Sequence, residues 1–161
     1  MYAFYTREII MGVSVEILLS EDHQSIDGLY DEYLNEKRLN PARALELFQK
    51  YKLSLLRHIK CEEDLIFPVV AQFPNEPCFQ EVSILRDEHQ IIVPLLMEVE
   101  RDLKEKNDSN ATERKLFEEL HEHNAREEMR VYGPLDRLLN EGQKQAVADA
   151  LKSLRLFPKA G

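Results

Sequence analysis

The chain has 161 residues, which is enough for one domain with a sizeable core, so we expect a single domain over residues 1–161. Lysine and arginine total 21 against 30 aspartates and glutamates, and this net charge of −9 argues against a nucleic-acid-binding protein. A hydrophobic fraction of 43% excludes a disordered chain, and only 5 glycines and 7 prolines disfavour a turn-rich β fold.

The apolar run near the N-terminus does not resemble a secretion signal or a membrane span. Residues 9–15 form this run, which stops at Glu16 and lacks a small-residue cleavage site. No stretch of the chain approaches the ~18 apolar residues of a spanning helix. Two cysteines, Cys61 and Cys78, are too few for a disulfide framework. We therefore expect a cytoplasmic protein without a membrane partner.

Apolar residues recur at helical spacing in four long segments. The first begins at about Ser20, a candidate N-cap. The second opens at Asn40-Pro41, where an N-cap residue precedes a proline in the first turn, and it stops near Phe73-Pro74. These two segments are expected to be helices.

The third segment begins after Pro77 and ends in the polar stretch 106–110, and the fourth starts near Thr112. Pro94 and Pro134 lie inside these two segments and should kink them. A shorter amphipathic piece follows near the C-terminus. Because the connections are short, successive helices should be antiparallel. We expect an all-α fold, an up-down-up-down four-helix bundle with its core at about residues 20–140 and short N- and C-terminal extensions.

A local pattern around the histidines occurs twice along the chain. His23 and His89, 66 residues apart, are each followed by glutamine and preceded by two acidic residues. His58 and His123, 65 residues apart, each begin a His-x-x-x-Glu motif. A two-helix unit has therefore been used twice.

The duplicated pattern predicts a polar centre inside the bundle. Residues four apart share one face of a helix, and the two His-x-x-x-Glu pairs share their faces with apolar residues. The other two histidines also fall on apolar faces. Six candidate metal ligands should therefore converge: His23, His58, Glu62, His89, His123 and Glu127.

Such a set points to a metal centre because a buried, unpaired carboxylate is costly and a cation removes that cost. Two similar ligand sets suggest two ions, each with two histidines, bridged by Glu62 and Glu127. Nitrogen and oxygen ligands without a thiolate suit iron or manganese, and zinc stays open. A single histidine on an apolar face is more often a hydrogen-bonded core residue, but four of the five histidines in a duplicated pattern favour the metal centre.

The arrangement resembles the hemerythrin-like HHE cation-binding family, whose signature is one histidine on the first and third helices and His-x-x-x-Glu on the second and fourth. The resemblance covers about residues 20–140. Its most specific pieces are His58-x-x-x-Glu62-Glu63 before Phe67-Pro68, and His123-x-x-x-Glu127-Glu128 before Tyr132. The resemblance implies a non-haem di-iron centre with two oxo- or hydroxo-bridged iron ions that binds O2, nitric oxide, peroxide or related small ligands.

The chain departs from the oxygen-carrying members of that family. Those carriers have a second histidine on the third helix, where this chain has Val93, and an aspartate at longer spacing where it has Glu127. The set is closer to the di-iron domain of iron–sulfur repair proteins, whose cysteine-bearing N-terminal segment has no counterpart before Ser20. Three functions stay open: a reversible small-ligand binder, a di-iron enzyme or iron donor in oxidative or nitrosative stress defence, and a structural zinc bundle.

Helical geometry also gives expectations for neighbours of the six ligands. Asp27 should contact a ligand or lie in solvent, while Tyr30 and Cys61 should pack in the core. Three polar side chains should face solvent: Glu63, His121 and Glu128.

Overall fold

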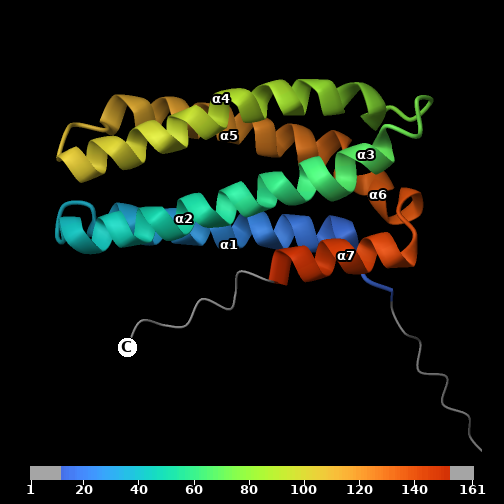
Figure 1. Ribbon diagram of the computed structural model, residues 1–161, viewed down its shortest axis with the longest axis horizontal. Helices are drawn as coiled ribbons and strands as arrows, with labels where there is room; N and C mark the ends of the chain where they lie inside the picture. Colours follow the sequence, from blue (N-terminus) through green and yellow to red (C-terminus); the bar gives the residue numbers. More distant parts are fainter. Residues whose placement is uncertain (1–11, 153–161) are drawn as a thin grey trace, which may run out of the picture.

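The computed structural model describes residues 12–152, and these residues form helices with short connections and no strand (Figure 1). Four helices are long: α1 (Val15–Glu36), α2 (Pro41–Cys61), α4 (Cys78–Glu105) and α5 (Asn110–Arg130). Four shorter segments complete the described chain: the π-helical turn η1 (Glu62–Ile66), α3 (Phe67–Val70), α6 (Tyr132–Leu138) and α7 (Glu141–Lys152). The all-α prediction is confirmed.

The long helices pack as two pairs. Helix α1 lies along α2, and α4 lies along α5, as Figure 1 shows. The two pairs meet mainly through α2 and α4, with a smaller contact between α1 and α5. Helix α7 packs against α1 and α2, and α6 packs against α1. The predicted C-terminal extension forms helix α7 as far as Lys152, whereas the chain before residue 12 and after residue 152 lies outside the described residues.

The predicted start of the first helix is wrong by several residues. The N-cap is Ser14, whose hydroxyl accepts a hydrogen bond from the Ile17 amide, whereas Ser20 lies within α1. Ser14 also donates to Asp136 on α6, a tertiary contact that the local sequence does not reveal. The predicted start of the second helix is confirmed, because Asn40 accepts from the amide of the third residue after it.

The ends of the other segments follow the prolines. Helix α4 starts directly after Pro77, and its C-cap is Lys106, which has a left-handed φ of 58°. Pro94 lies inside α4, and the helix continues past it. The fourth segment breaks between α5 and α6, three residues before Pro134. A proline cannot donate to the carbonyl four residues earlier and clashes with it, which accounts for a break at this place.

The apolar core is divided into two clusters. One contains residues from the start of α1, the start of α4, and α3, α6 and α7; the other contains residues from the opposite halves of the long helices. On α1, His23 lies between Leu19 of the first cluster and Ile26 of the second. On α4, His89 lies between Leu85 and Ile92 in the same way. The candidate centre is therefore a polar layer between two apolar ones.

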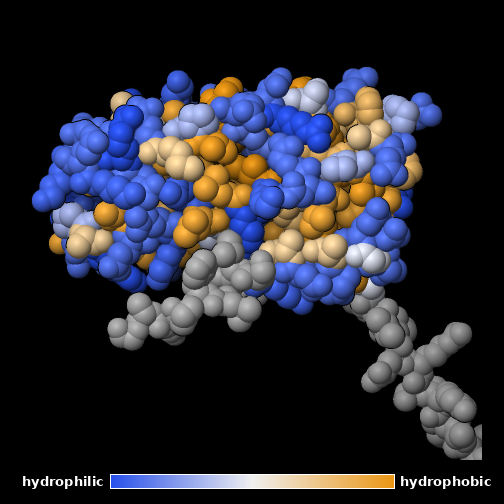
Figure 2. All heavy atoms as spheres, viewed as in Figure 1, coloured by the Kyte–Doolittle hydropathy of each residue, from blue (hydrophilic) through white to orange (hydrophobic). Residues whose placement is uncertain are grey.

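The outer surface is mixed. Figure 2 shows hydrophilic side chains over much of one face, with apolar side chains gathered toward its middle and right. Within residues 12–152, no helix is both long and apolar enough to cross a membrane.

Candidate metal centre

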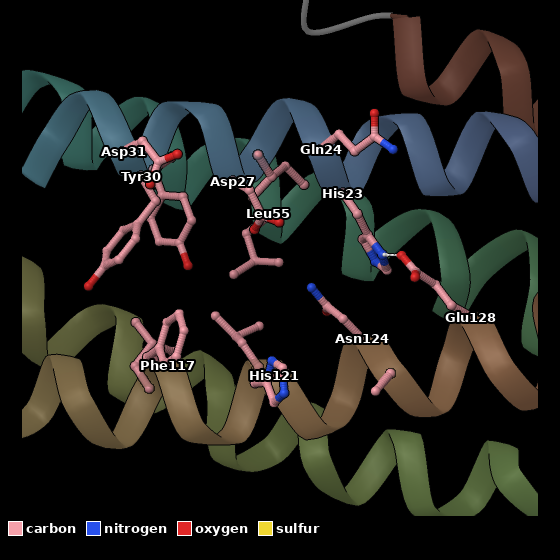
Figure 3. Close-up of a pocket in the computed structure, with 15 residues that line it drawn as sticks. His23, Gln24, Asp27, Tyr30, Asp31, Leu55, Phe117, His121, Asn124 and Glu128 are labelled. Carbon is pink, nitrogen blue, oxygen red and sulfur yellow. Dashed lines mark hydrogen bonds and ion pairs between the residues drawn. The ribbon is translucent and has the colours of Figure 1, made fainter.

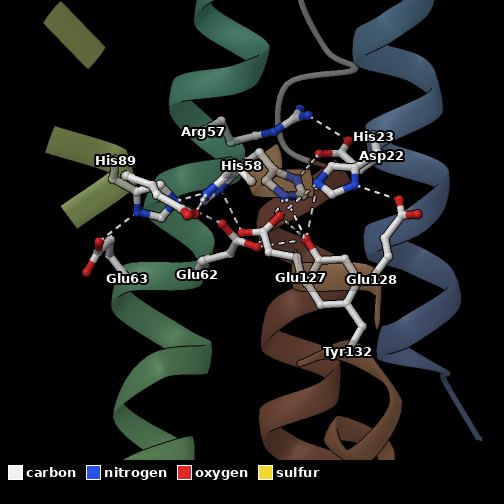
Figure 4. Close-up of polar contacts among 12 residues, drawn as sticks. Asp22, His23, Arg57, His58, Glu62, Glu63, His89, Glu127, Glu128 and Tyr132 are labelled. Atoms are coloured by element: carbon white, nitrogen blue, oxygen red, sulfur yellow. Dashed lines mark hydrogen bonds and ion pairs between the residues drawn. The ribbon is translucent and has the colours of Figure 1, made fainter. Parts of the chain in front are cut away.

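All six predicted ligands are brought together and buried, each with an exposed fraction of 4% or less (Figure 4). They come from five elements: His23 from α1, His58 from α2, Glu62 from η1, His89 from α4, and His123 and Glu127 from α5. They form two groups, and within each group all the potential ligand atoms lie within 4.8 Å of one another. One group is Glu62, His89, His123 and Glu127, and the other is His23, His58 and Glu127. The described residues therefore bring together donors that could hold metal ions.

The four histidines form two pairs, His23 with His58 and His89 with His123, and each glutamate has one oxygen facing each pair. Oε1 of Glu62 lies 3.3 Å from Nε2 of His58, and its Oε2 lies 3.4 Å from Nε2 of His89. Oε2 of Glu127 lies 3.2 Å from Nε2 of His23, and its Oε1 lies 2.9 Å from Nε2 of His123. Both carboxylates thus stand between the two pairs, as bridging ligands would.

Two oxygens of these carboxylates lack a hydrogen-bond partner within the described residues. They are Oε2 of Glu62 and Oε1 of Glu127, both fully buried, and the nearby histidine nitrogens do not have hydrogen-bond geometry toward them. A buried carboxylate oxygen without a donor is costly, and a cation would satisfy it. The donor set therefore fits metal binding.

The π-helical turn η1 was not predicted, and the second helical segment is not a continuous α-helix. In η1 the amide of Phe67 reaches the carbonyl of Glu62, five residues earlier. Such turns occur frequently at functional sites. Pro68 is the signal that was available, because it has no amide to close a regular turn onto Asp64.

The histidine nitrogens that point outward are each paired with a carboxylate. The Nδ1–carboxylate distances are 2.9 Å for His23–Glu128, 2.8 Å for His58–Asp22, 2.8 Å for His89–Glu63 and 2.8 Å for His123–Glu88. An Nδ1–H donated outward leaves the Nε2 lone pair directed at the centre, as metal-bound histidines require. We call Asp22, Glu63, Glu88 and Glu128 the outer carboxylates.

The solvent prediction for Glu63 holds only in part, since this side chain is partly buried and accepts from His89. Glu128 is exposed as predicted, and it also accepts from His23. Asp22 and Glu88 were not predicted to take part. The available signal was that each outer carboxylate is next to a predicted ligand in the sequence. Each one nevertheless accepts a hydrogen bond from a histidine on a different helix. Only the packing of the helices reveals which histidine each carboxylate contacts.

Three of the outer carboxylates also have an arginine partner. Arg57 lies 2.9 Å from Asp22, Arg86 lies 3.0 Å from Glu63, and Arg126 lies 3.0 Å from Glu88. The exception is Glu128, whose side chain is 47% exposed and which has no arginine partner within residues 12–152. His23 therefore has the most accessible surroundings of the four histidines.

The ionisation of the centre follows from its close charge pairs. Burial opposes the charged form of His58, but the Glu62 carboxylate and the hydrogen bond with Asp22 raise the pKa of His58 to about 10. Burial also opposes the charged form of His123, and Glu127 raises its pKa to about 9. Burial tends to raise the pKa of Glu62, yet the charge on His58 holds that pKa well below its usual value. Without metal, protons occupy the place of the cations.

A cavity of about 550 Å³ adjoins His23 between α1, α2 and α5 (Figure 3). Its lining includes the carboxylates Asp27, Asp31 and Glu128 and contains no lysine or arginine. Burial raises the pKa of Asp27, with His23 acting in the opposite direction and the two neighbouring carboxylates raising it further. A second cavity of about 370 Å³ adjoins His89.

The remaining neighbours lie largely as expected. Asp27 and His121 are exposed, and both line the larger cavity. Tyr30 is partly buried, with its hydroxyl 3.4 Å from Glu113. Cys61 is buried and belongs to neither candidate ligand group.

With this geometry in place, comparison with protein families is decisive. The Hemerythrin HHE cation binding domain matches residues 16–154. The chain belongs to this family. Comparisons with curated proteins and with solved structures gave no match. The hemerythrin family predicted from the sequence is therefore confirmed, and the buried His/Glu groups are where its cation-binding site could lie.

Proposed function

We propose that this hemerythrin HHE protein is a non-haem di-iron protein that binds O2, nitric oxide or related small ligands. The observation that carries the proposal is that Glu62 and Glu127 each turn one oxygen toward each histidine pair. The proposed iron ligands are His23, His58, Glu62, His89, His123 and Glu127. We propose one domain over residues 1–161, with the long helices in an up-down-up-down bundle.

Bound iron would supply redox-active positions at which a small ligand binds. The protein's own groups prepare that site. The outer carboxylates orient the histidine rings through Nδ1, and the apolar clusters on both sides exclude water. An oxo or hydroxo bridge between the two irons is part of the proposal.

The larger cavity is the proposed approach to the centre. It reaches His23, and its carboxylate lining favours neutral molecules such as O2, nitric oxide or hydrogen peroxide over anions. The net charge of −9 and the free thiols of Cys61 and Cys78 support a small-molecule partner and a cytoplasmic location.

A second candidate is a di-iron enzyme or iron donor in oxidative or nitrosative stress defence. The volume of the larger cavity, about 550 Å³, favours it, because organic ligands occupy sites of this size and a diatomic molecule needs far less. A peroxidase would use this space for a reductant.

Exposure of the reduced, iron-loaded protein to nitric oxide, O2 and peroxide tests these functions. We expect a ligand-dependent absorption change with nitric oxide, and reversibility with O2 would support the binder. Sustained peroxide consumption with a reductant would support the enzyme. The control is Asp149→Asn, which changes an exposed carboxylate on α7 outside the ligand set and outside the lining of both cavities and should behave as the parent. A protein holding zinc and inert to all three would contradict both.

A further inference from the structure

Tyr132 places a hydroxyl group inside the centre. Its side chain is buried, and its oxygen lies 2.8 Å from Oε1 of Glu62 and 3.0 Å from Oε2 of Glu127 (Figure 4). The same oxygen lies 3.2 Å from Nε2 of His58 and 3.2 Å from Nε2 of His23. Four candidate ligand atoms therefore surround one phenolic oxygen.

These contacts exceed what one hydroxyl group can satisfy. A tyrosine hydroxyl has a single hydrogen, so it donates to only one of the four atoms. Both carboxylate oxygens are acceptors, and Nε2 of a neutral histidine that donates through Nδ1 is an acceptor too. With His23 and His58 neutral, as metal ligands must be, the four atoms are all acceptors and the single Tyr132 hydrogen cannot satisfy them. In that state a bound cation supplies the positive charge that protons supply in the metal-free centre.

The separations match those of neighbouring ligands on one metal ion. An octahedral ion with bonds of about 2.1 Å holds adjacent ligand atoms about 3 Å apart. The Tyr132 oxygen stands at 2.8–3.2 Å from all four atoms, as an additional ligand on the same ion would. The His23–His58 side otherwise offers three ligand atoms in a compact group, one fewer than the other side.

The duplicated unit makes this hydroxyl specific to one half of the centre. Tyr132 lies nine residues after His123, and its counterpart nine residues after His58 is Phe67. The Phe67 ring stacks on His89, with centroids 5.7 Å apart and planes at 16°. Phenylalanine has no hydroxyl group that could bind a metal ion, so the two halves of the repeat differ at this position.

The chain break before α6 positions the tyrosine. Helix α5 ends at Arg130 and α6 begins at Tyr132, so this side chain does not follow the regular face of α5. The ring packs in the same apolar cluster as Leu19 and Val131, which fixes its orientation. The hydroxyl therefore reaches the centre from the side of this apolar cluster, and not from the face of α5 that carries His123 and Glu127.

We propose that the phenolic oxygen of Tyr132 is a ligand of the ion held by His23 and His58, which makes the two metal positions chemically inequivalent. On binding, the O–H bond breaks, the oxygen keeps the electron pair and bonds to the ion, and the proton is released to solution. This inference rests on the proposed di-metal centre. It adds a seventh ligand to the six predicted ones.

Resonance Raman spectroscopy of the oxidised, iron-loaded full chain tests the assignment. A tyrosinate bound to Fe(III) gives a visible charge-transfer band, and excitation in that band enhances the ring vibrations of the bound tyrosine. We expect both signals in the parent protein, with vibrational shifts after labelling with ring-deuterated tyrosine. Bound iron without tyrosinate vibrations would overturn the assignment and leave the di-iron function standing. Absence of bound iron would contradict the di-iron function itself.

A pair of variants locates the signal. Tyr132→Phe removes the proposed ligand and should abolish the band while about two irons per chain are retained. Tyr33→Phe is the matched control, because Tyr33 is also buried and its hydroxyl donates to Glu113, away from the centre. The control should keep the band. Persistence of the band in folded Tyr132→Phe, verified by circular dichroism, would overturn the assignment, and if that variant fails to fold the isotope shift in the parent decides.

Discussion

The outward nitrogen of each histidine determines how firmly its ring is held at the centre. Asp22 is buried and pairs with both His58 and Arg57, whereas Glu128 is half-exposed and pairs with His23. Solvent competes for the exposed pair but not for the buried one. The four outer carboxylates should therefore contribute unequally to metal affinity.

Exchange of the two carboxylates for amides measures this inequality. Asp22→Asn should lower iron affinity by about 10–100-fold, because it weakens the orientation of His58 and leaves Arg57 without its charge partner. Glu128→Gln should have a smaller effect, since water can replace the lost acceptor. Competition with a chromophoric chelator gives both affinities. Equal losses in the two variants would contradict the importance of burial.

Asp27 is predicted to control the approach of anions. It lines the larger cavity with Asp31 and Glu128, so its removal lessens the negative potential there. Asp27→Asn should accelerate azide binding to the oxidised protein several-fold at low salt, with the difference shrinking as salt is added. Stopped-flow absorption measures the rate, and Asp149→Asn on α7 is the control. An unchanged azide rate would place the entry route elsewhere.

At the scale of elements, the helical segments could be predicted because their signals are local. Asn40-Pro41 and the position after Pro77 are capping and breaking signals that act within one turn. The start of α1 could not be predicted in this way, because Ser14 is held by Asp136 more than a hundred residues away. The two His-x-x-x-Glu pairs were predictable from four-residue spacing, and the other two candidate histidines from the repeat. Asp22 and Glu88 were not, because they contact histidines on other helices.

The π-helical turn η1 makes a prediction of its own. Pro68 denies the chain a regular hydrogen bond at this place, so Pro68→Ala should let an α-helix compete with the π-turn. That change would rotate Glu62 relative to the centre. We expect lower iron affinity with an unchanged or higher melting temperature of the metal-free protein. Pro94→Ala, within α4, is the control and should keep iron affinity. A Pro68→Ala variant with full iron affinity would show that the turn does not depend on the proline.

At the scale of the whole molecule, we expect the polar layer to couple folding to metal binding. The candidate ligands lie between two apolar clusters, so the unfolded chain could not hold the ions in the same way. A metal present at about 100 times its Kd stabilises the fold by about 2.7 kcal/mol. We expect chelation to lower the melting temperature by about 5–10 °C in calorimetry. An unchanged melting curve after verified metal removal would mean that the protonated centre is equally stable.

The metal-free protein should also become less stable as pH rises. The pKa of His58 is raised to about 10 and that of His123 to about 9, against about 6.5 in the unfolded chain. Below pH 6.5 both states bind these protons, and the stabilisation is fully present. Between pH 6.5 and about 10 only the folded state does, so stability is lost as pH rises. Melting temperatures of the chelated protein at pH 6.5 and 9.5 test this, and a higher value at pH 9.5 would contradict the charge pairing.

The most direct measurement is the iron content of the purified protein combined with its magnetic state. If Glu62 and Glu127 bridge two ions, elemental analysis should find about two irons per chain. Mössbauer spectra of the oxidised, ⁵⁷Fe-enriched protein should then show a coupled diferric pair, without the electron paramagnetic resonance signal of isolated Fe(III). One zinc with no iron, or a single isolated ferric ion per chain, would contradict the bridged di-iron centre.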